Sequence, residues 1–238
     1  KTITRKEKTA LLKILPSYCQ YLKENPNSLL MKIFGVYKFR SFISSNVYIL
    51  LMENVHQVCL ETIEAKYDLK GSTFRRETII PPELLESRRY SSLVLKDINF
   101  MEMEDPITLC PSEYKRLTVT LSHDIRFLQS AGIMDYSISL VKLNSSLHGR
   151  DSSCPSPNPS VNSGLSQLLF SDTRNSAKYS IGIIDLTQTY TCRKLMENRY
   201  KRVVHGVPGD SLSAISPQRY GDRMLEFVGQ HFVEETKE

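Results

Sequence analysis

The order of apolar patterns along the chain is the feature that most constrains its fold. Residues 3–23 place apolar side chains at helical spacing between charged ones, which predicts an amphipathic helix that is interrupted or bent at Pro16. Residues 29–39 and 46–52 predict two strands, and a short strand follows at 67–70. Because strands precede most of the helices, we expect an α+β fold with two lobes.

The second half of the chain predicts further elements separated by loops. Residues 78–111 contain four prolines and predict mostly loop. Residues 112–130 predict a helix that Ser112 caps and Gly132 stops, and residues 133–143 predict a strand or a strand-like turn. This helix carries an apolar stripe of Leu117, Leu121, Ile125 and Leu128.

A polar insert interrupts the apolar patterns at about residues 144–178. It is rich in Ser, Asn and Pro and cannot bury much apolar surface, so we expect it to be disordered, with transient docking of 165–170. Residues 179–186 then predict a buried strand. A last helix is expected from Pro217, with an inner face of Tyr220, Met224, Phe227, Val228 and His231.

Composition excludes several classes of protein. The 238 residues are 40% hydrophobic and 24% charged, which is typical of a globular protein, and the net charge of +5 suits an anionic partner. The five cysteines form no CxxC motif, so we expect neither structural zinc nor a disulfide framework but a reducing, cytosolic compartment. The longest apolar run, at 47–52, is too short to span a bilayer, and no secretory signal opens the chain. Because the chain does not begin with Met, we expect a fragment or a processed product.

The stretch YDLKGSTFRRE at 67–77 surrounds a Gly-Ser-Thr turn with charge. Gly71 allows close approach of a ligand to the backbone, and Lys70, Arg75 and Arg76 offer positive charge to a phosphate. A solvated hairpin end is the alternative interpretation. The turn taken alone does not decide between the two.

Two aspartates stand where a strand meets a loop. Asp135 lies in GIMDYS before an apolar strand, and Asp185 ends the apolar stretch YSIGIID. Carboxylates aimed by rigid elements can serve as a catalytic-loop acid or base and as a magnesium ligand in phosphoryl transfer. The spacing alone favours the commoner alternative, in which each Asp caps a turn or a helix.

A basic run lies at 193–202. It can bind an anionic leaflet or form a solvated or nucleic-acid-binding surface. No aromatic interleaving of the kind used for single strands is evident, which argues against nucleic acid. The run contains one acid, Glu197, and five basic residues, which are Arg193, Lys194, Arg199, Lys201 and Arg202.

Several ordered motifs together resemble the phosphatidylinositol phosphate kinase family. YDLKGST (67–73), LKDINF (95–100), GIMDYS (132–137) and IGIIDLTQTY (181–190) occur in this order. The flanking stretches LLKILPSYCQYL, NPNSLLMKIFGVY and PQRYGDRMLEF match as well, so that the resemblance covers nearly the whole chain outside 144–178. The stretch MDYSIS stands where the family usually has MDYSLL, which puts the polar Ser139 at a normally apolar position.

The resemblance implies a two-lobed lipid-kinase catalytic domain with antiparallel sheets. Residues 1–54 would be the remainder of an N-terminal lobe, because the family's glycine-rich segment should lie before Lys1 and the small lobe is then truncated. Residues 55–238 would form the C-terminal lobe. Its activation segment would span about 186–217.

The resemblance also implies roles at the nucleotide site. Lys1 would contact the ATP phosphates, and the stretch Met52–Val55, with Asn54 and Val55 as contacts, would be the hinge near adenine. Asp185 would hold Mg²⁺. ATP and Mg²⁺ are therefore the expected substrate and cofactor.

On the lipid side the resemblance implies a second set of roles. Asp135 would be the catalytic aspartate, and Lys70 and Arg76 would face the phosphates of nucleotide and lipid. Glu197 would read the lipid head group, because it falls where the 4-phosphate 5-kinase subfamily carries Glu. The five basic residues of 193–202 would contact the membrane.

The expected activity is transfer of the ATP γ-phosphate to the 5-hydroxyl of phosphatidylinositol 4-phosphate. The expected partner is a phosphoinositide in an anionic membrane rather than nucleic acid, with a cytoplasmic, peripheral location at the cytosolic membrane face. The alternatives are a kinase for the 5-phosphate or 3-phosphate isomer and a catalytically weak phosphoinositide-binding scaffold. Protein-kinase activity is not expected, since the chain has no HRD or DFG tripeptide. The oligomeric state stays open.

Overall fold

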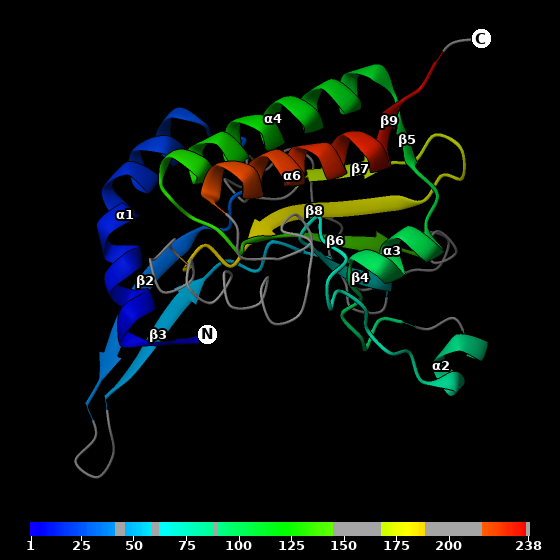
Figure 1. The fold of residues 1–238 in the computed structure, drawn as a ribbon. Helices are drawn as coiled ribbons and strands as arrows, with labels where there is room; N and C mark the ends of the chain where they lie inside the picture. Colours follow the sequence, from blue (N-terminus) through cyan, green and yellow to red (C-terminus); the bar gives the residue numbers. More distant parts are fainter. Residues whose placement is uncertain (41–45, 59–61, 88–89, 145–167, 189–215, 237–238) are drawn as a thin grey trace, which may run out of the picture.

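The computed structural model describes residues 1–40, 46–58, 62–87, 90–144, 168–188 and 216–236 (Figure 1). Its strands form three sheets. Together with the helices they make an α+β arrangement, which confirms the predicted fold class. Two sheets are antiparallel throughout, and the third is a parallel pair of short strands. The predicted antiparallel character therefore holds for the two larger sheets.

The smaller antiparallel sheet has the strand order β1-β3-β2. It comprises β1 (Thr2–Ile3), β3 (Val47–Met52) and β2 (Ile33–Phe39), close to the two strands predicted at 29–39 and 46–52. Alternation along β3 buries Leu50 on one face and leaves Leu51 half exposed on the other. The strand period thus gives this sheet one packed face.

Helix α1 (Arg5–Glu24) follows β1 and packs beside this sheet (Figure 1). Thr4 and Glu7 form a capping box, which satisfies main-chain donors of the first turn. The helix runs through Pro16 without a break, so the predicted interruption is wrong. Its inner face is buried on both sides of the proline, and this packing outweighs the lost main-chain hydrogen bond. The buried residues are Leu11, Ile14 and Tyr18.

The larger sheet has the order β4-β6-β8-β7 and is antiparallel throughout. Its strands are β4 (Ile63–Leu69), β6 (Ser137–Leu143), β8 (Lys178–Ile184) and β7 (Leu168–Ser171). The strand predicted at 67–70 therefore begins four residues earlier. β8 is buried almost along its whole length, as its apolar run predicted.

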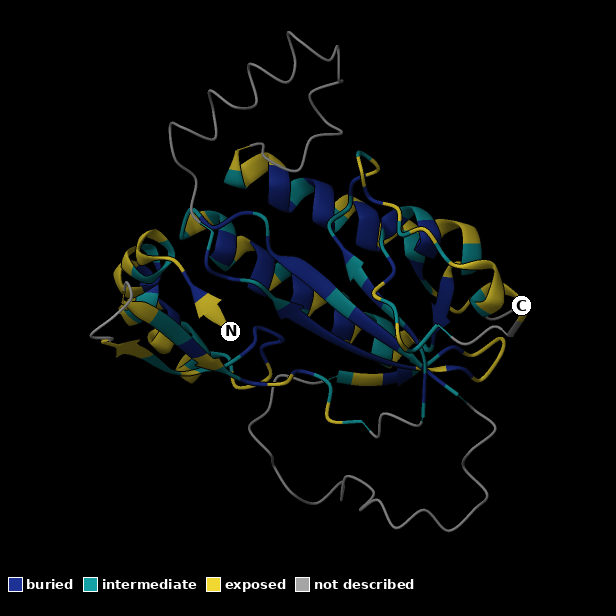
Figure 2. Ribbon diagram, turned by 90° about the horizontal axis from the view of Figure 1, so that it is seen from below, coloured by how far each residue is buried: buried dark blue, intermediate teal, exposed yellow. Residues whose placement is uncertain are grey.

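Two long helices cover one face of the larger sheet (Figures 1 and 2). They are α4 (Pro111–Ser130) and α6 (Pro217–His231). Every residue of the predicted stripe on α4 is fully buried. The N-cap of α4 is Cys110, with Pro111 in the first turn, so the predicted cap at Ser112 is wrong. Proline is favoured in that first turn because its fixed φ suits the helix and its missing N–H costs nothing there.

The stretch 78–111, predicted as mostly loop, contains three short elements. These are α2 (Pro82–Ser87), α3 (Asp97–Met103) and β5 (Ile107–Leu109). β5 pairs in parallel with β9 (Phe232–Glu234), which directly follows α6. Elements this short have too few residues for a clear period, and tertiary contacts decide them.

The C-terminal part of the predicted disordered insert is ordered. Residues 145–167 lie outside the described residues, but β7 falls within the predicted range and pairs with β8. Phe170 on β7 is buried and stacks on Tyr179, with ring centroids 5.7 Å apart. The ladder with β8 and this aromatic contact together stabilise β7 next to the polar segment.

The chain passes from the smaller to the larger sheet after Glu53. The predicted boundary between two lobes, at residue 54, lies in this connection and stays a prediction. None of the helices that the structure describes has the length and hydropathy needed to cross a membrane.

Candidate active site

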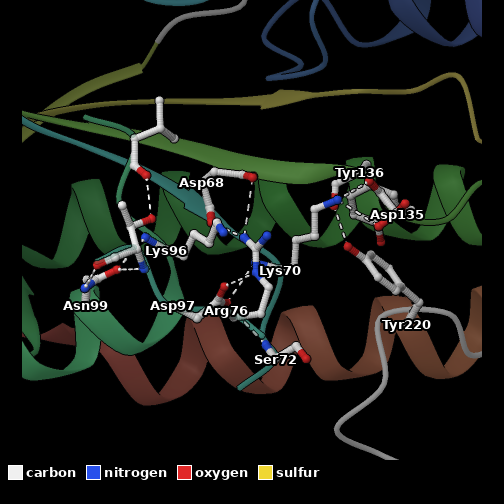
Figure 3. A network of polar contacts seen from close by, with 12 residues as sticks. Asp68, Lys70, Ser72, Arg76, Lys96, Asp97, Asn99, Asp135, Tyr136 and Tyr220 are labelled. Atoms are coloured by element: carbon white, nitrogen blue, oxygen red, sulfur yellow. Dashed lines mark hydrogen bonds and ion pairs between the residues drawn. The ribbon is translucent and has the colours of Figure 1, made fainter. Parts of the chain in front are cut away.

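Asp135 lies between α4 and β6 and carries a strained backbone. Its φ is 64°, in the left-handed region that residues other than glycine seldom adopt. The Nζ atom of Lys70 lies 2.7 Å from its Oδ1 and 2.9 Å from its main-chain oxygen (Figure 3). The N–H of Met134 donates to the carbonyl of Gln188, at 3.0 Å, and fixes the segment before it. Strain of this kind clusters at functional sites.

Asp185 directly follows β8 and has a left-handed backbone as well, with φ of 65°. Its Oδ1 lies 2.5 Å from the Nζ of Lys1. Ser137 at the start of β6 pairs with Ile184 at the end of β8. The antiparallel ladder therefore brings Asp135 and Asp185, fifty residues apart in the chain, to the same end of the sheet.

The turn after β4 is held by a buried carboxylate. Asp97, at the start of α3, is fully buried. One oxygen accepts from the main-chain N–H groups of Lys70 and Ser72, at 2.8 and 3.2 Å. The other accepts from Nε of Arg76 at 2.7 Å (Figure 3). This carboxylate thus closes the Gly-Ser-Thr turn from inside and sets the position of the Lys70 backbone.

Arg76 is 9% exposed and is held by carboxylates. Besides Asp97, its guanidinium donates to the main-chain oxygen of Asp68 and lies 3.5 Å from the Asp68 Oδ2 atom. The sequence resemblance predicts that Arg76 faces phosphates, and that contact stays a prediction. In the structure the Arg76 side chain stabilises the Gly-Ser-Thr turn.

Gly71 is required by close packing against α6. Its φ is 59°, and a Cβ atom there would lie 3.2 Å from the Arg223 carbonyl and 3.3 Å from Cβ of Phe227. Any side chain would therefore be strained and crowded at once. In this structure the glycine serves helix packing, while its role in approaching a phosphate stays a prediction.

A cavity of about 410 Å³ opens between the two larger sheets, beside Asp185. A volume of this size lies within the usual range for small-molecule sites. Asn54 and Val55, the residues predicted to lie near adenine, line it. Within the described part of the chain their main-chain N–H groups make no hydrogen bond, so these groups are available to a ligand. The lining combines charged Lys1 and Asp185 with apolar Met31, Leu50 and Ile184.

The cavity wall contains a histidine that the sequence analysis did not single out. The Nδ1 and Nε2 atoms of His56 each lie 2.7 Å from a serine hydroxyl, of Ser180 and Ser139 respectively. Burial, with a smaller contribution from Lys66, lowers the pKa of His56 to about 4. The imidazole is therefore neutral near pH 7. A polar residue at a normally apolar position, Ser139, was the available signal.

Among the residues that the structure describes, no three His, Cys, Asp or Glu side chains gather into a metal-binding group. Mg²⁺ is commonly held by one or two carboxylates together with substrate phosphates and water. Asp185, at the cavity and about 39% exposed in its side chain, is a suitable ligand of this type. Glu197 and the five basic residues of 193–202 lie outside the described residues.

Comparison with known proteins decides the family. The family model described as phosphatidylinositol-4-phosphate 5-kinase matches residues 1–168 and 160–231. The chain belongs to this family. The resemblance predicted from the ordered motifs is thereby confirmed.

Three relatives of the phosphatidylinositol-4-phosphate 5-kinase family show the extent of the match. Human phosphatidylinositol 4-phosphate 5-kinase type-1 beta is 30% identical over 263 residues, covering 96% of this chain and 47% of the relative. The human type-1 alpha protein is 29% identical, with 96% and 45% covered. A probable phosphatidylinositol phosphate kinase of Dictyostelium discoideum is 28% identical, with 96% and 38% covered. The chain thus spans less than half the length of these relatives.

Proposed function

We propose that the protein is a phosphatidylinositol 4-phosphate 5-kinase, which transfers the γ-phosphate of ATP to the 5-hydroxyl of the lipid. The observation that carries this proposal is the meeting of two lysine–aspartate pairs at one end of a sheet, where the Lys1–Asp185 pair lines a cavity of about 410 Å³. Membership of the family supports it, and so do the names of the human relatives.

The nucleotide is proposed to bind in the cavity between the sheets. The base would lie against Met31, Leu50 and Ile184, with the free main-chain N–H groups of Asn54 and Val55 as its hydrogen-bond donors. Lys1 would leave Asp185 and move to the phosphates. Its 2.5 Å contact with that carboxylate shows that its ammonium reaches the charged end of the cavity.

Asp135 is proposed to act on the lipid hydroxyl. Its carboxylate accepts the proton of the 5-hydroxyl while that oxygen bonds to the γ-phosphorus and the bond to the β,γ-bridging oxygen of ATP breaks. Lys70, 2.7 Å from the carboxylate, orients it and offsets negative charge that develops on the transferred group. Bound Mg²⁺, with Asp185 as a ligand, would neutralise phosphate charge.

The remaining predicted parts belong to the same proposal. Residues 1–54 would form the N-terminal lobe and residues 55–238 the C-terminal lobe, with an activation segment at about 186–217. This segment would lie on an anionic membrane at the cytosolic face through the basic residues of 193–202. Glu197 would favour the 4-phosphate isomer by disfavouring other phosphate positions.

A lipid-kinase assay on vesicles tests the proposal. Purified protein receives ATP, Mg²⁺ and phosphatidylinositol 3-, 4- or 5-phosphate in separate, otherwise identical vesicles. We expect the 4-phosphate to be the preferred substrate and the bisphosphate product to carry its new phosphate at the 5-position. Preference for another isomer would reject the substrate assignment. Vesicle binding without turnover on any isomer would favour the phosphoinositide-binding scaffold.

A further inference from the structure

His56 forms a polar bridge to two neighbouring strands of the larger sheet. Its ring nitrogens each lie 2.7 Å from a hydroxyl, that of Ser139 on β6 and that of Ser180 on β8. A neutral imidazole has one donor and one acceptor nitrogen, so one serine accepts a hydrogen bond and the other donates one. Both bonds are thus compatible with the neutral ring.

The bridge anchors one end of the short segment 53–56, with which the chain leaves the smaller sheet. At the near end, the N–H of Glu53 donates to the Lys32 carbonyl at 2.8 Å, and the Glu53 carboxylate accepts from the Lys32 N–H at 3.0 Å. At the far end, the N–H of His56 donates to Oδ1 of Asn54 at 3.3 Å, while its ring binds the larger sheet. Asn54 and Val55 thus lie between two residues, Glu53 and His56, that hydrogen bonds hold in place.

The bridge also sits within the cavity itself, because His56 and Ser139 both line it. Lys66 on β4 adds positive charge beside the ring, and Asp185, Lys1 and Glu53 are the other charged groups of the cavity lining. An apolar side chain at position 56 would remove the imidazole from the hydroxyls of Ser139 and Ser180, and Ser180 is fully buried. Losing hydrogen bonds inside a protein is costly, so the three residues act as a unit.

We infer that His56, held by Ser139 and Ser180, is a positioning residue for nucleotide binding that keeps the main-chain groups of Asn54 and Val55 aimed into the cavity. The inference rests on the nucleotide site of the proposed function. It makes no use of the lipid side of the reaction. Loss of the bridge therefore affects the KM for ATP and spares lipid binding.

Two substitutions at position 56 separate the hydrogen bonds from the packing. His56→Gln keeps one donor and one acceptor on its amide, whereas His56→Phe keeps a ring and removes both. His123→Phe, on the exposed face of α4, is the matched control. Each purified variant is measured in two ways. Hydrogen exchange of the amides of residues 54–57 is followed without nucleotide, and the dissociation constant for AMP-PNP with Mg²⁺ is determined by calorimetry.

We expect His56→Phe to speed exchange at 54–57 and to weaken AMP-PNP binding, each by about tenfold, the value of one or two net hydrogen bonds. The KM for ATP should rise similarly while kcat at saturating ATP changes little. His56→Gln should restore both readouts to within about threefold of the wild type, and His123→Phe should change neither.

Unchanged exchange at 54–57 in His56→Phe would overturn the inference, whatever the nucleotide result. Faster exchange with unaltered AMP-PNP affinity would overturn it too, because the segment would then be free to move without consequence. A wild-type protein that does not bind AMP-PNP at all would reject the proposed nucleotide site. The exchange rates would still decide whether His56 holds the segment.

Discussion

The two lysine–aspartate pairs of the site have the same chemistry and different surroundings. Lys70 and Asp135 lie 2.7 Å apart, with side-chain exposures of 14% and 33%. Lys1 and Asp185 lie 2.5 Å apart, with exposures of 36% and 39%. An ion pair at a solvated surface contributes little to stability, whereas one backed by buried groups is held in place. The first pair is therefore part of the fold, and the second is free to exchange partners.

The main chain is held at both lysines. At Lys70 the N–H donates to Asp97 and the carbonyl accepts from Arg223 Nη2 at 3.1 Å. At Lys1 the carbonyl accepts from the Leu50 N–H of β3 at 2.8 Å. The two pairs therefore differ in the exposure of their side chains, and the proposed change of partner at Lys1 needs only its side chain to move.

Asp97→Ala is expected to have the largest effect, because Asp97 holds the main chain at Lys70 and thereby supports the less exposed Lys70–Asp135 pair. Arg76 would lose its fully buried carboxylate partner and keep only Asp68, and removing one member of a buried ion pair costs roughly 3–5 kcal/mol. We expect the free energy of unfolding in urea to fall by this amount, together with loss of activity. Glu226→Ala, in the exposed pair with Arg219 at 3.6 Å, is the control and should cost less than about 1 kcal/mol. Equal losses in the two variants would contradict the buried support.

Replacing each carboxylate by its amide separates chemistry from structure. Asn tolerates the left-handed backbone that Asp135 and Asp185 share, so Asp135→Asn and Asp185→Asn should keep the fold. We expect Asp135→Asn to lower turnover by about 10²–10⁴-fold, the usual loss when an acid–base group is removed. Asp185→Asn should abolish turnover, because its carboxylate is the proposed Mg²⁺ ligand.

Turnover is measured as labelled lipid product on phosphatidylinositol 4-phosphate vesicles. Phosphate release from ATP alone would not report transfer to the lipid. Circular dichroism melting checks that each variant is folded. A variant that keeps most of its turnover would remove that aspartate from the mechanism. The comparison would then describe two structural ion pairs.

The long periodic elements were predictable from sequence, since their packing repeats over several turns. Helix α4 and strand β8 each bury the apolar side chains that the pattern indicated. The two aspartates were also identifiable, because a carboxylate next to an apolar strand is visible in one short stretch. Which sheet end they share could not be predicted, since strand order depends on contacts distant in the chain.

The supporting polar groups escaped prediction for a physical reason. Asp97 lies in LKDINF and His56 in a short connection, where polar side chains are usually solvated. Their burial follows only once Arg76 or the serines of β6 and β8 are placed against them. The β5–β9 pair escaped for the same reason, because three-residue strands depend on a distant partner.

The neutral His56 in the cavity wall gives the stability of the protein a pH dependence. Burial lowers its folded-state pKa to about 4, below the value of about 6.5 in an unfolded chain. The unfolded state therefore binds more protons between these values, and stability falls as the pH drops through this window. The slope from this group is at most about 1.4 kcal/mol per pH unit.

Urea unfolding between pH 7 and pH 4 measures that slope, with His56→Phe as the comparison. The variant lacks the titrating ring, so we expect its stability to fall less steeply over the same range. Carboxylates contribute equally to both proteins and cancel in the difference. Parallel curves would show that the ring titrates alike in the folded and unfolded states.

The smallest expected effect on stability concerns the more exposed ion pair, Lys1–Asp185. Lys1→Met keeps much of the side-chain volume and removes the charge, and a solvated ion pair contributes only about 0–1 kcal/mol. We therefore expect the free energy of unfolding to change within this range, while AMP-PNP binds more weakly because a phosphate contact is lost. Lys70→Met should cost more stability, since Asp135 then loses the less exposed ammonium that donates to its carboxylate and to its main-chain oxygen. A larger stability loss at Lys1 than at Lys70 would reverse the comparison and make the Lys1–Asp185 pair the structural one.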